Sequence, residues 1–246
     1  MLKDFLLGAG YVLRGLRLIR RPGLRRFVVV PLLLNSALFA LGIWWGYQLL
    51  DSEVIHRLPG WLAWARWLLV PLFVVTVSII VFFTFSLLAN LVGAPFNALL
   101  AERVERLLGG APPDQGGGLW RLAGEALRSL WAELAKLLYL ALWALPLLLL
   151  FLVPGLNVLA PFAWAAFSAW MLALEYADYP MGNHAIPFRR QRRILRRRRG
   201  LAWGFGGAIL LLTSVPLVNF LVMPVAVAGA TALWVERLRG EVERVS

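Results

Sequence analysis

Charged residues are absent from four long stretches of the chain, which cover residues 27–50, 67–101, 137–174 and 201–235. A helix needs about 20 apolar residues, rising about 1.5 Å per residue, to cross a hydrocarbon core about 30 Å thick. Each stretch is long enough to enter such a core. The pattern therefore predicts one all-α integral membrane domain that extends over residues 1–246.

The first two stretches predict two full transmembrane helices. Residues 27–50 suit one tilted span. The second stretch is too long for one span and too short for two, and Gly93 and Pro95 interrupt it. We therefore expect a second span over residues 67–92, after which the chain leaves the membrane core.

Amphipathic segments flank these spans. In residues 1–22, apolar side chains recur at helical spacing, opposite several arginines. In residues 93–136 leucines recur in the same way on two further helices, which a polar link over residues 109–118 separates. We assign that link no role. The pattern favours helices that lie on the membrane surface.

The third and fourth stretches resemble each other and predict two re-entrant helical hairpins. Each has a proline, then an asparagine, then a second proline: Pro154, Asn157 and Pro161, and Pro216, Asn219 and Pro224. Proline pairs at this spacing break a helix and would leave arms of roughly 16 to 25 Å, short of the about 30 Å needed to cross. We expect hairpins over residues 137–174 and 201–235 whose tips stop inside the bilayer. Two ordinary pairs of spanning helices are the alternative.

Composition and charge agree with a membrane protein. The 246 residues are 61% hydrophobic, yet carry a net charge of +12. Basic residues concentrate before residue 27 and in residues 189–199, whereas residues 51–66 hold equal numbers of basic and acidic residues. The positive-inside rule then places both termini in the cytoplasm. Nucleic-acid binding is disfavoured because the aromatic residues lie in apolar stretches, away from the arginines.

The chain lacks the residues and motifs that several kinds of metal and enzyme chemistry require. The chain has no cysteine, and its two histidines, His56 and His184, lie far apart in sequence, so zinc and haem sites are disfavoured. No phosphate-binding loop and none of the usual hydrolase motifs occurs. We expect neither an enzyme nor a cofactor.

An anion site is predicted in the sequence RRPGLRRF, which precedes the first span. Pro22 disfavours helix before it, and Gly23 permits a turn, so the amides of Gly23, Leu24, Arg25 and Arg26 should lack acceptors. Free amides at a helix start and two guanidinium groups suit a tetrahedral oxyanion. Anchoring of the helix at lipid headgroups by the two arginines is the alternative.

A second group of polar residues follows the second span and consists of Asn90, Asn97, Glu102, Glu105 and Arg106. Polar groups at membrane depth usually face the protein interior or a water path. They are candidates for a transport pathway in which Glu102 or Glu105, beside Arg106, gates an anion or exchanges a proton. A surface ion pair between Glu102 and Arg106, one helical turn apart, is the plainer explanation.

Two further segments permit two interpretations each. The sequence EYADYPMGNH, residues 175–184, predicts either a turn that pins the first hairpin or part of an inner vestibule. The arginine run of residues 189–199 is typical of a topology signal that binds anionic lipid, and the alternative is a funnel that concentrates anions.

The sequences GLRRFVVVPLLLN, GAPFNALLAERVE, EYADYPMGNH and VPLVNFLVMPVAVAGAT, in this order, resemble the CysZ-type bacterial sulfate permeases. The resemblance covers nearly the whole chain. It implies an inner-membrane homo-oligomer that takes up sulfate for cysteine biosynthesis, with sulfate bound by Gly23, Leu24, Arg25 and Arg26. A non-transporting membrane scaffold or lipid-binding protein is the alternative function.

Overall fold

The computed structural model describes residues 1–49, 66–110, 119–242 and 244, and every regular element in these ranges is a helix. The chain divides into two compact units. One unit contains Met1–Arg25 and Asn97–Ser246, and the other contains Arg26–Phe96. The predicted all-helical class is confirmed.

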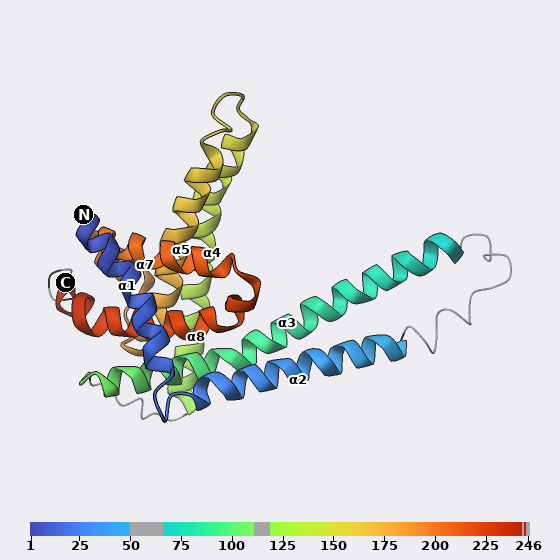
Figure 1. The fold of residues 1–246 in the computed structure, drawn as a ribbon, viewed down its shortest axis with the longest axis horizontal. Coiled ribbons are helices and arrows are strands. Elements are labelled where there is room, and N and C mark those ends of the chain that lie inside the picture. The colour runs from blue at the N-terminus through green and yellow to red at the C-terminus, as the bar shows by residue number, and fades with distance from the viewer. Residues whose placement is uncertain (50–65, 111–118, 243, 245–246) are drawn as a thin grey trace. The chain divides into compact units, whose positions relative to one another are not determined.

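The smaller unit is a pair of helices. It contains α2, Arg26–Leu49, and the first part of α3, Arg66–Leu107. The two helices lie side by side (Figure 1), and a Cβ atom added to Gly42 on α2 would lie 2.7 Å from the ring of Phe85 on α3. Large apolar side chains such as Trp44 and Phe83 point outward and are exposed. Such a surface is suited to contact with lipid.

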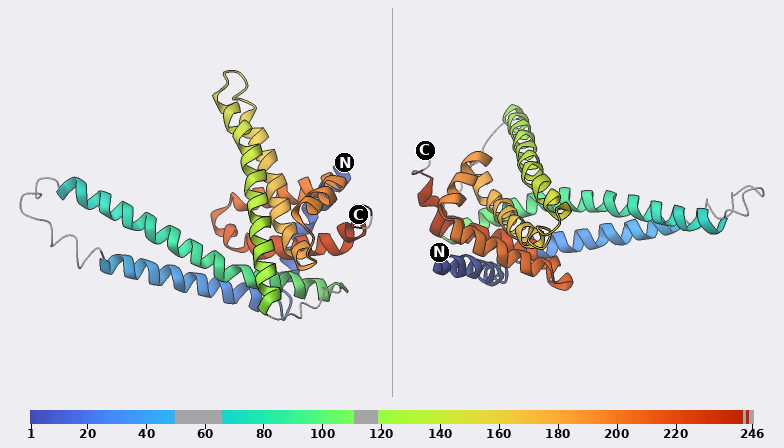
Figure 2. Two further views of the ribbon diagram at one scale, coloured as in Figure 1. Left: turned by 180° about the vertical axis from the view of Figure 1, so that it is seen from behind. Right: turned by 90° about the horizontal axis from the view of Figure 1, so that it is seen from above.

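The core of the larger unit is formed by four helices. These are α1, Leu2–Ile19; α5, Ala160–Asn183; α7, Arg199–Thr213; and α8, Pro216–Leu233. Helices α1 and α5 each pack against both α7 and α8 (Figure 2). After α8 the chain continues through a π-helical turn, Trp234–Leu238, and a 3₁₀ turn, Arg239–Glu241.

Glycines bring these helices into backbone contact. A Cβ atom at Gly15 of α1 would overlap the carbonyl oxygen of Val225 on α8, and one at Gly206 of α7 would overlap that of Ala169 on α5. Close approach through small residues is the usual way in which helices associate in membranes. It explains why α1, although amphipathic, is partly buried rather than lying wholly on a lipid surface.

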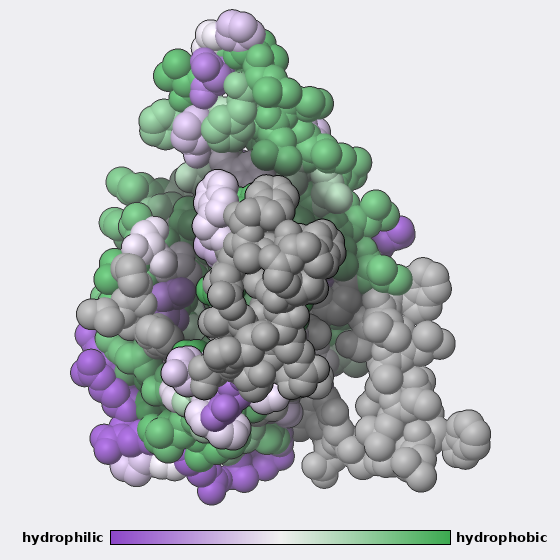
Figure 3. Space-filling view, turned by 90° about the vertical axis from the view of Figure 1, so that its right-hand side faces the viewer, coloured by the Kyte–Doolittle hydropathy of each residue, from purple (hydrophilic) through white to green (hydrophobic). Residues whose placement is uncertain are grey.

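The remaining helices of this unit are α4, Leu119–Leu152, and α6, Phe188–Arg197. The end of α4 and the start of α5 form a projecting hairpin, which is covered mainly by apolar side chains (Figure 3). Among the described residues three helical segments are long and apolar enough to cross a membrane: Arg26–Gln48, Leu134–Leu152 and Leu221–Glu241. The number of full spans and the re-entrant hairpins stay predictions.

One predicted helix break is wrong. Helix α3 continues through Gly93 and Pro95 to Leu107 without an interruption. Helix α4 joins the predicted amphipathic segment to the first hairpin arm in one helix. Where the second span ends in the membrane stays a prediction. A proline inside a helix removes one hydrogen bond, and a local pattern does not show whether the surrounding packing offsets that loss. Residues 111–118 of the predicted link lie outside the described residues.

The predicted hairpin breaks are partly right. The first occurs where expected, because α4 ends at Leu152 and α5 begins at Ala160. The second is shorter than expected, because Pro216 occupies the first turn of α8 and Pro224 lies inside that helix. Helix α5 has 24 residues and continues past the expected end of the hairpin arm, residue 174, to Asn183. Whether the tip of this hairpin stops inside the bilayer stays a prediction.

Candidate functional site

The predicted anion segment forms a turn between α1 and α2. Gly23 has a φ angle of +90°, which favours glycine, and α2 begins at Arg26. The Leu24 amide donates a hydrogen bond to the carbonyl oxygen of Arg21 over 3.2 Å, and the Leu24 side chain is buried. The turn was therefore predicted correctly, but the Leu24 amide is not free for an anion.

The two arginines of this segment are exposed. Arg25 belongs to the larger unit, and its Nε donates to the carbonyl oxygen of Arg20 over 2.7 Å. Arg26 begins the smaller unit, and its guanidinium carbon lies 5.0 Å from the ring centre of Phe27. Neither arginine has an acidic partner among the described residues. Both retain terminal N–H groups that suit an oxyanion.

The pathway candidates on α3 separate into an exposed pair and buried groups. Glu102 and Arg106 form an ion pair on the helix surface, as the plainer interpretation predicted. Asn97 is buried. The side chain of Asn90 lies outside the described residues. Among the described residues the candidates therefore divide between the surface and the interior of the protein.

Glu105 is the most deeply buried of these groups, because its side chain has no exposed surface. Its Oε1 lies 2.7 Å from Nε2 of His184, and the His184 ring lies against Trp234 with 5.5 Å between the ring centres. The other carboxylate oxygen has no hydrogen-bond partner among the described residues. Since buried polar atoms are usually paired, this contact is a candidate functional feature. Sequence reasoning missed it because the two residues are 79 positions apart.

The sequence EYADYPMGNH is not the turn that we expected. Helix α5 continues through it to Asn183, and its side chains bind neighbouring helices. Asp178 pairs with Lys136 of α4 and accepts a hydrogen bond from Gln191 of α6 over 2.6 Å. Asn183 donates to a backbone carbonyl of α3 over 3.2 Å. This segment therefore fixes three helices to α5.

The arginine run of residues 189–199 forms α6 and the start of α7, and part of it has structural contacts. Arg198 pairs with the buried Glu241 over 3.0 Å, and Arg190 donates to the carbonyl oxygen of Val242 over 2.8 Å. These contacts hold the C-terminal segment against α6. Arg193 and Arg196, by contrast, are exposed.

Metal binding has no candidate ligands within the described ranges, because no group of three or more His, Asp or Glu side chains could hold an ion there. Exposed apolar helices that are long enough to cross a membrane, together with a basic turn before α2, are typical of a helical membrane protein.

Comparisons with known proteins identify the family. A family described as "Sulfate transporter CysZ/Etoposide-induced protein 2.4" matches residues 11–224, and the chain belongs to this family. A protein named sulfate transporter CysZ from Vibrio cholerae is 45% identical over 93% of this chain and 92% of its own. Those from Pectobacterium atrosepticum and Salmonella typhimurium are 42% and 41% identical, over 94% and 95% of this chain and 86% and 94% of theirs.

Proposed function

We propose that this protein is a sulfate permease of the bacterial inner membrane. The observation that carries the proposal is its identity of 41% to 45% with relatives named sulfate transporters, over nearly its full length. Uptake would supply sulfate for cysteine biosynthesis, in a homo-oligomer with both termini in the cytoplasm. Transport would need no covalent step.

The turn at Gly23, Leu24, Arg25 and Arg26 is our proposed sulfate-binding segment. A dianion that leaves water needs charge and hydrogen-bond donors to replace its hydration. Two exposed guanidinium groups without acidic partners in the described residues provide both. The positive φ of Gly23 supports this role, because it turns the chain immediately before α2. The Leu24 amide would contribute little, since it is already hydrogen bonded.

Binding and uptake of labelled sulfate by purified protein in liposomes test this proposal. We expect Arg25→Ala and Arg26→Ala each to weaken sulfate binding about tenfold to a hundredfold, because a hydrogen bond to a charged group contributes about 1.5 to 3 kcal/mol. Arg25→Lys should be intermediate, because lysine keeps the charge but lacks the planar fork. Arg20→Ala is the matched control, because it removes one positive charge from an exposed residue that directly follows α1.

The outcomes separate the function from the site. If wild type moves no sulfate, the permease proposal fails and the non-transporting membrane scaffold is favoured instead. If wild type transports and the Arg20 variant loses as much affinity as the other two, then general positive charge rather than this segment binds the anion.

A further inference from the structure

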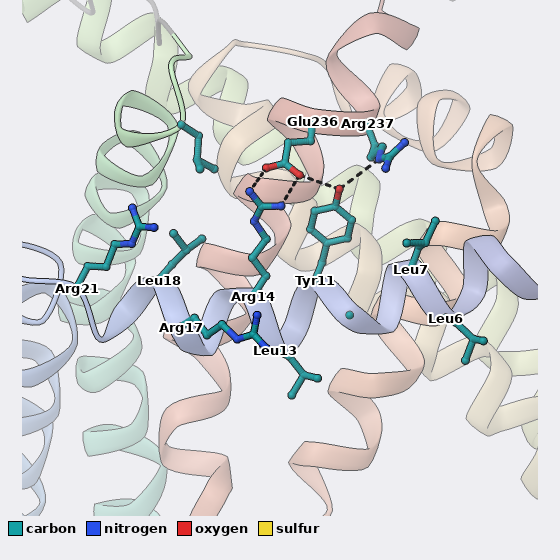
Figure 4. Close-up of a pocket in the computed structure, with 12 residues that line it drawn as sticks. Leu6, Leu7, Tyr11, Leu13, Arg14, Arg17, Leu18, Arg21, Glu236 and Arg237 are labelled. Carbon is teal, nitrogen blue, oxygen red and sulfur yellow. Dashed lines mark hydrogen bonds and ion pairs between the residues drawn. The ribbon is translucent and has the colours of Figure 1, made fainter.

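A basic pocket with a volume of about 580 Å³ lies between α1 and the π-helical turn that follows α8 (Figure 4). All its lining residues belong to the larger unit. Four arginines, one glutamate and five leucines contribute to the lining. The pocket therefore combines an excess of positive charge with an apolar surface.

The charges in this pocket fall into two groups. Arg14 is bound to Glu236, with 2.6 Å between Nη1 and Oε2, and the hydroxyl of Tyr11 donates to the same carboxylate over 3.0 Å. Burial raises the pKa of Tyr11 above its ordinary value, so Tyr11 stays a neutral donor. The side chains of Arg17 and Arg21 are exposed, and neither guanidinium group has an acidic or hydrogen-bonding partner among the described residues. Two complete guanidinium forks are thus free to bind an anion.

The apolar part of the lining lies on the same helix. Leu6 and Leu13 are 63% and 59% exposed, and both project away from the helical core (Figure 4). A soluble anion would gain nothing from these leucines, whereas a lipid would use both kinds of surface. Arginine binds phosphate oxygens through its planar fork, and an acyl chain can cover leucines at the membrane surface.

We propose that this pocket binds an anionic phospholipid, with the phosphate on Arg17 and Arg21 and an acyl chain along Leu6 and Leu13. The charge favours an anionic headgroup, because Glu236 neutralises only one of the four lining arginines. The bound lipid fixes α1 at the membrane surface. This inference is independent of sulfate transport, because none of these four residues belongs to the proposed sulfate segment.

Native mass spectrometry of the full chain in detergent tests the site, with phosphatidylglycerol and phosphatidylcholine as probes. We expect wild type to retain phosphatidylglycerol in preference to phosphatidylcholine. The double variant Arg17→Ala/Arg21→Ala should weaken phosphatidylglycerol binding about tenfold to thirtyfold, at about 1 kcal/mol for each arginine. The matched control Arg103→Ala/Arg239→Ala loses the same charge from exposed positions outside the pocket and outside the arginine run of residues 189–199, and it should bind as wild type does.

A second comparison separates lipid from a soluble anion. Glycerol phosphate and sulfate at millimolar concentration should leave phosphatidylglycerol bound, and the double variant Leu6→Ser/Leu13→Ser should weaken lipid binding. Displacement by either soluble anion, or no effect of the leucine changes, would assign the pocket to a soluble anion instead.

Two other results would also overturn the proposal. Equal retention of the two phospholipids would mean that charge does not select the ligand. Equal losses in the pocket variant and in the Arg103→Ala/Arg239→Ala control would mean that diffuse charge attracts the lipid. Sulfate flux, measured separately, distinguishes failure of this site from failure of the permease proposal.

Discussion

Removal of the His184 ring should strongly destabilise the protein. The Glu105 side chain has no exposed surface, and its Oε1 lies 2.7 Å from His184 Nε2. In His184→Ala the carboxylate would lose the one side-chain partner that the structure gives it. Loss of one member of a buried pair costs about 3 to 5 kcal/mol. At about 2 to 4 °C per kcal/mol for a chain of this size, the melting temperature should fall by roughly 6 to 20 °C.

The substitution His184→Ala should lower the free energy of unfolding far less when position 105 carries no carboxylate. In a Glu105→Gln background, His184→Ala removes at most a neutral hydrogen bond, worth about 1 kcal/mol. Glu102→Gln is the matched control on α3, because it breaks the exposed pair with Arg106 and should cost no more than about 1 kcal/mol.

Denaturant unfolding of the four variants and wild type in detergent, followed by tryptophan fluorescence, gives the free energies of unfolding. The coupling free energy between positions 105 and 184 is the decisive quantity. If His184→Ala destabilises the protein equally with glutamate and with glutamine at position 105, the ring does not stabilise the buried carboxylate, and the predicted coupling is refuted.

Two further predictions concern helix packing and pH. Gly206→Ala should destabilise the protein by about 1 to 3 kcal/mol, because the new methyl group overlaps the Ala169 carbonyl oxygen. Gly207→Ala should be neutral or stabilising, because its nearest contact is a ring atom of Phe5 at 3.8 Å, and denaturant unfolding in detergent compares the two variants. Burial raises the pKa of Tyr176 to about 12, so the unfolded chain releases this proton first and stability should fall between pH 10 and 12. Tyr176→Phe should reduce that fall by up to about 3 kcal/mol, and an unchanged pH profile of unfolding would contradict this.

Part of the candidate site could be predicted from local sequence. Pro22 and Gly23 indicated a turn before α2, and the structure has Gly23 at a φ angle of +90°. Whether the amides in this turn are free could not be predicted, because the Leu24 amide finds an acceptor in Arg21. The surface pair of Glu102 and Arg106 followed from helical spacing alone.

The sequence by itself determined the all-helical class, the membrane setting and the first hairpin break. These follow from runs of neighbouring residues, because the cost of placing charge in hydrocarbon and the effect of proline on the backbone are local properties. The four uncharged stretches and the pair Pro154 and Pro161 were therefore enough.

Only the tertiary structure decided how distant residues meet. Arg14 reaches Glu236 across 222 positions, and Glu105 reaches His184 across 79. It also decided that Pro95 and Pro224 remain inside helices. The physical reason is the same in each case: the free energy of such a contact, or of a missing hydrogen bond, depends on which surfaces pack around it, and a local sequence pattern does not contain that information.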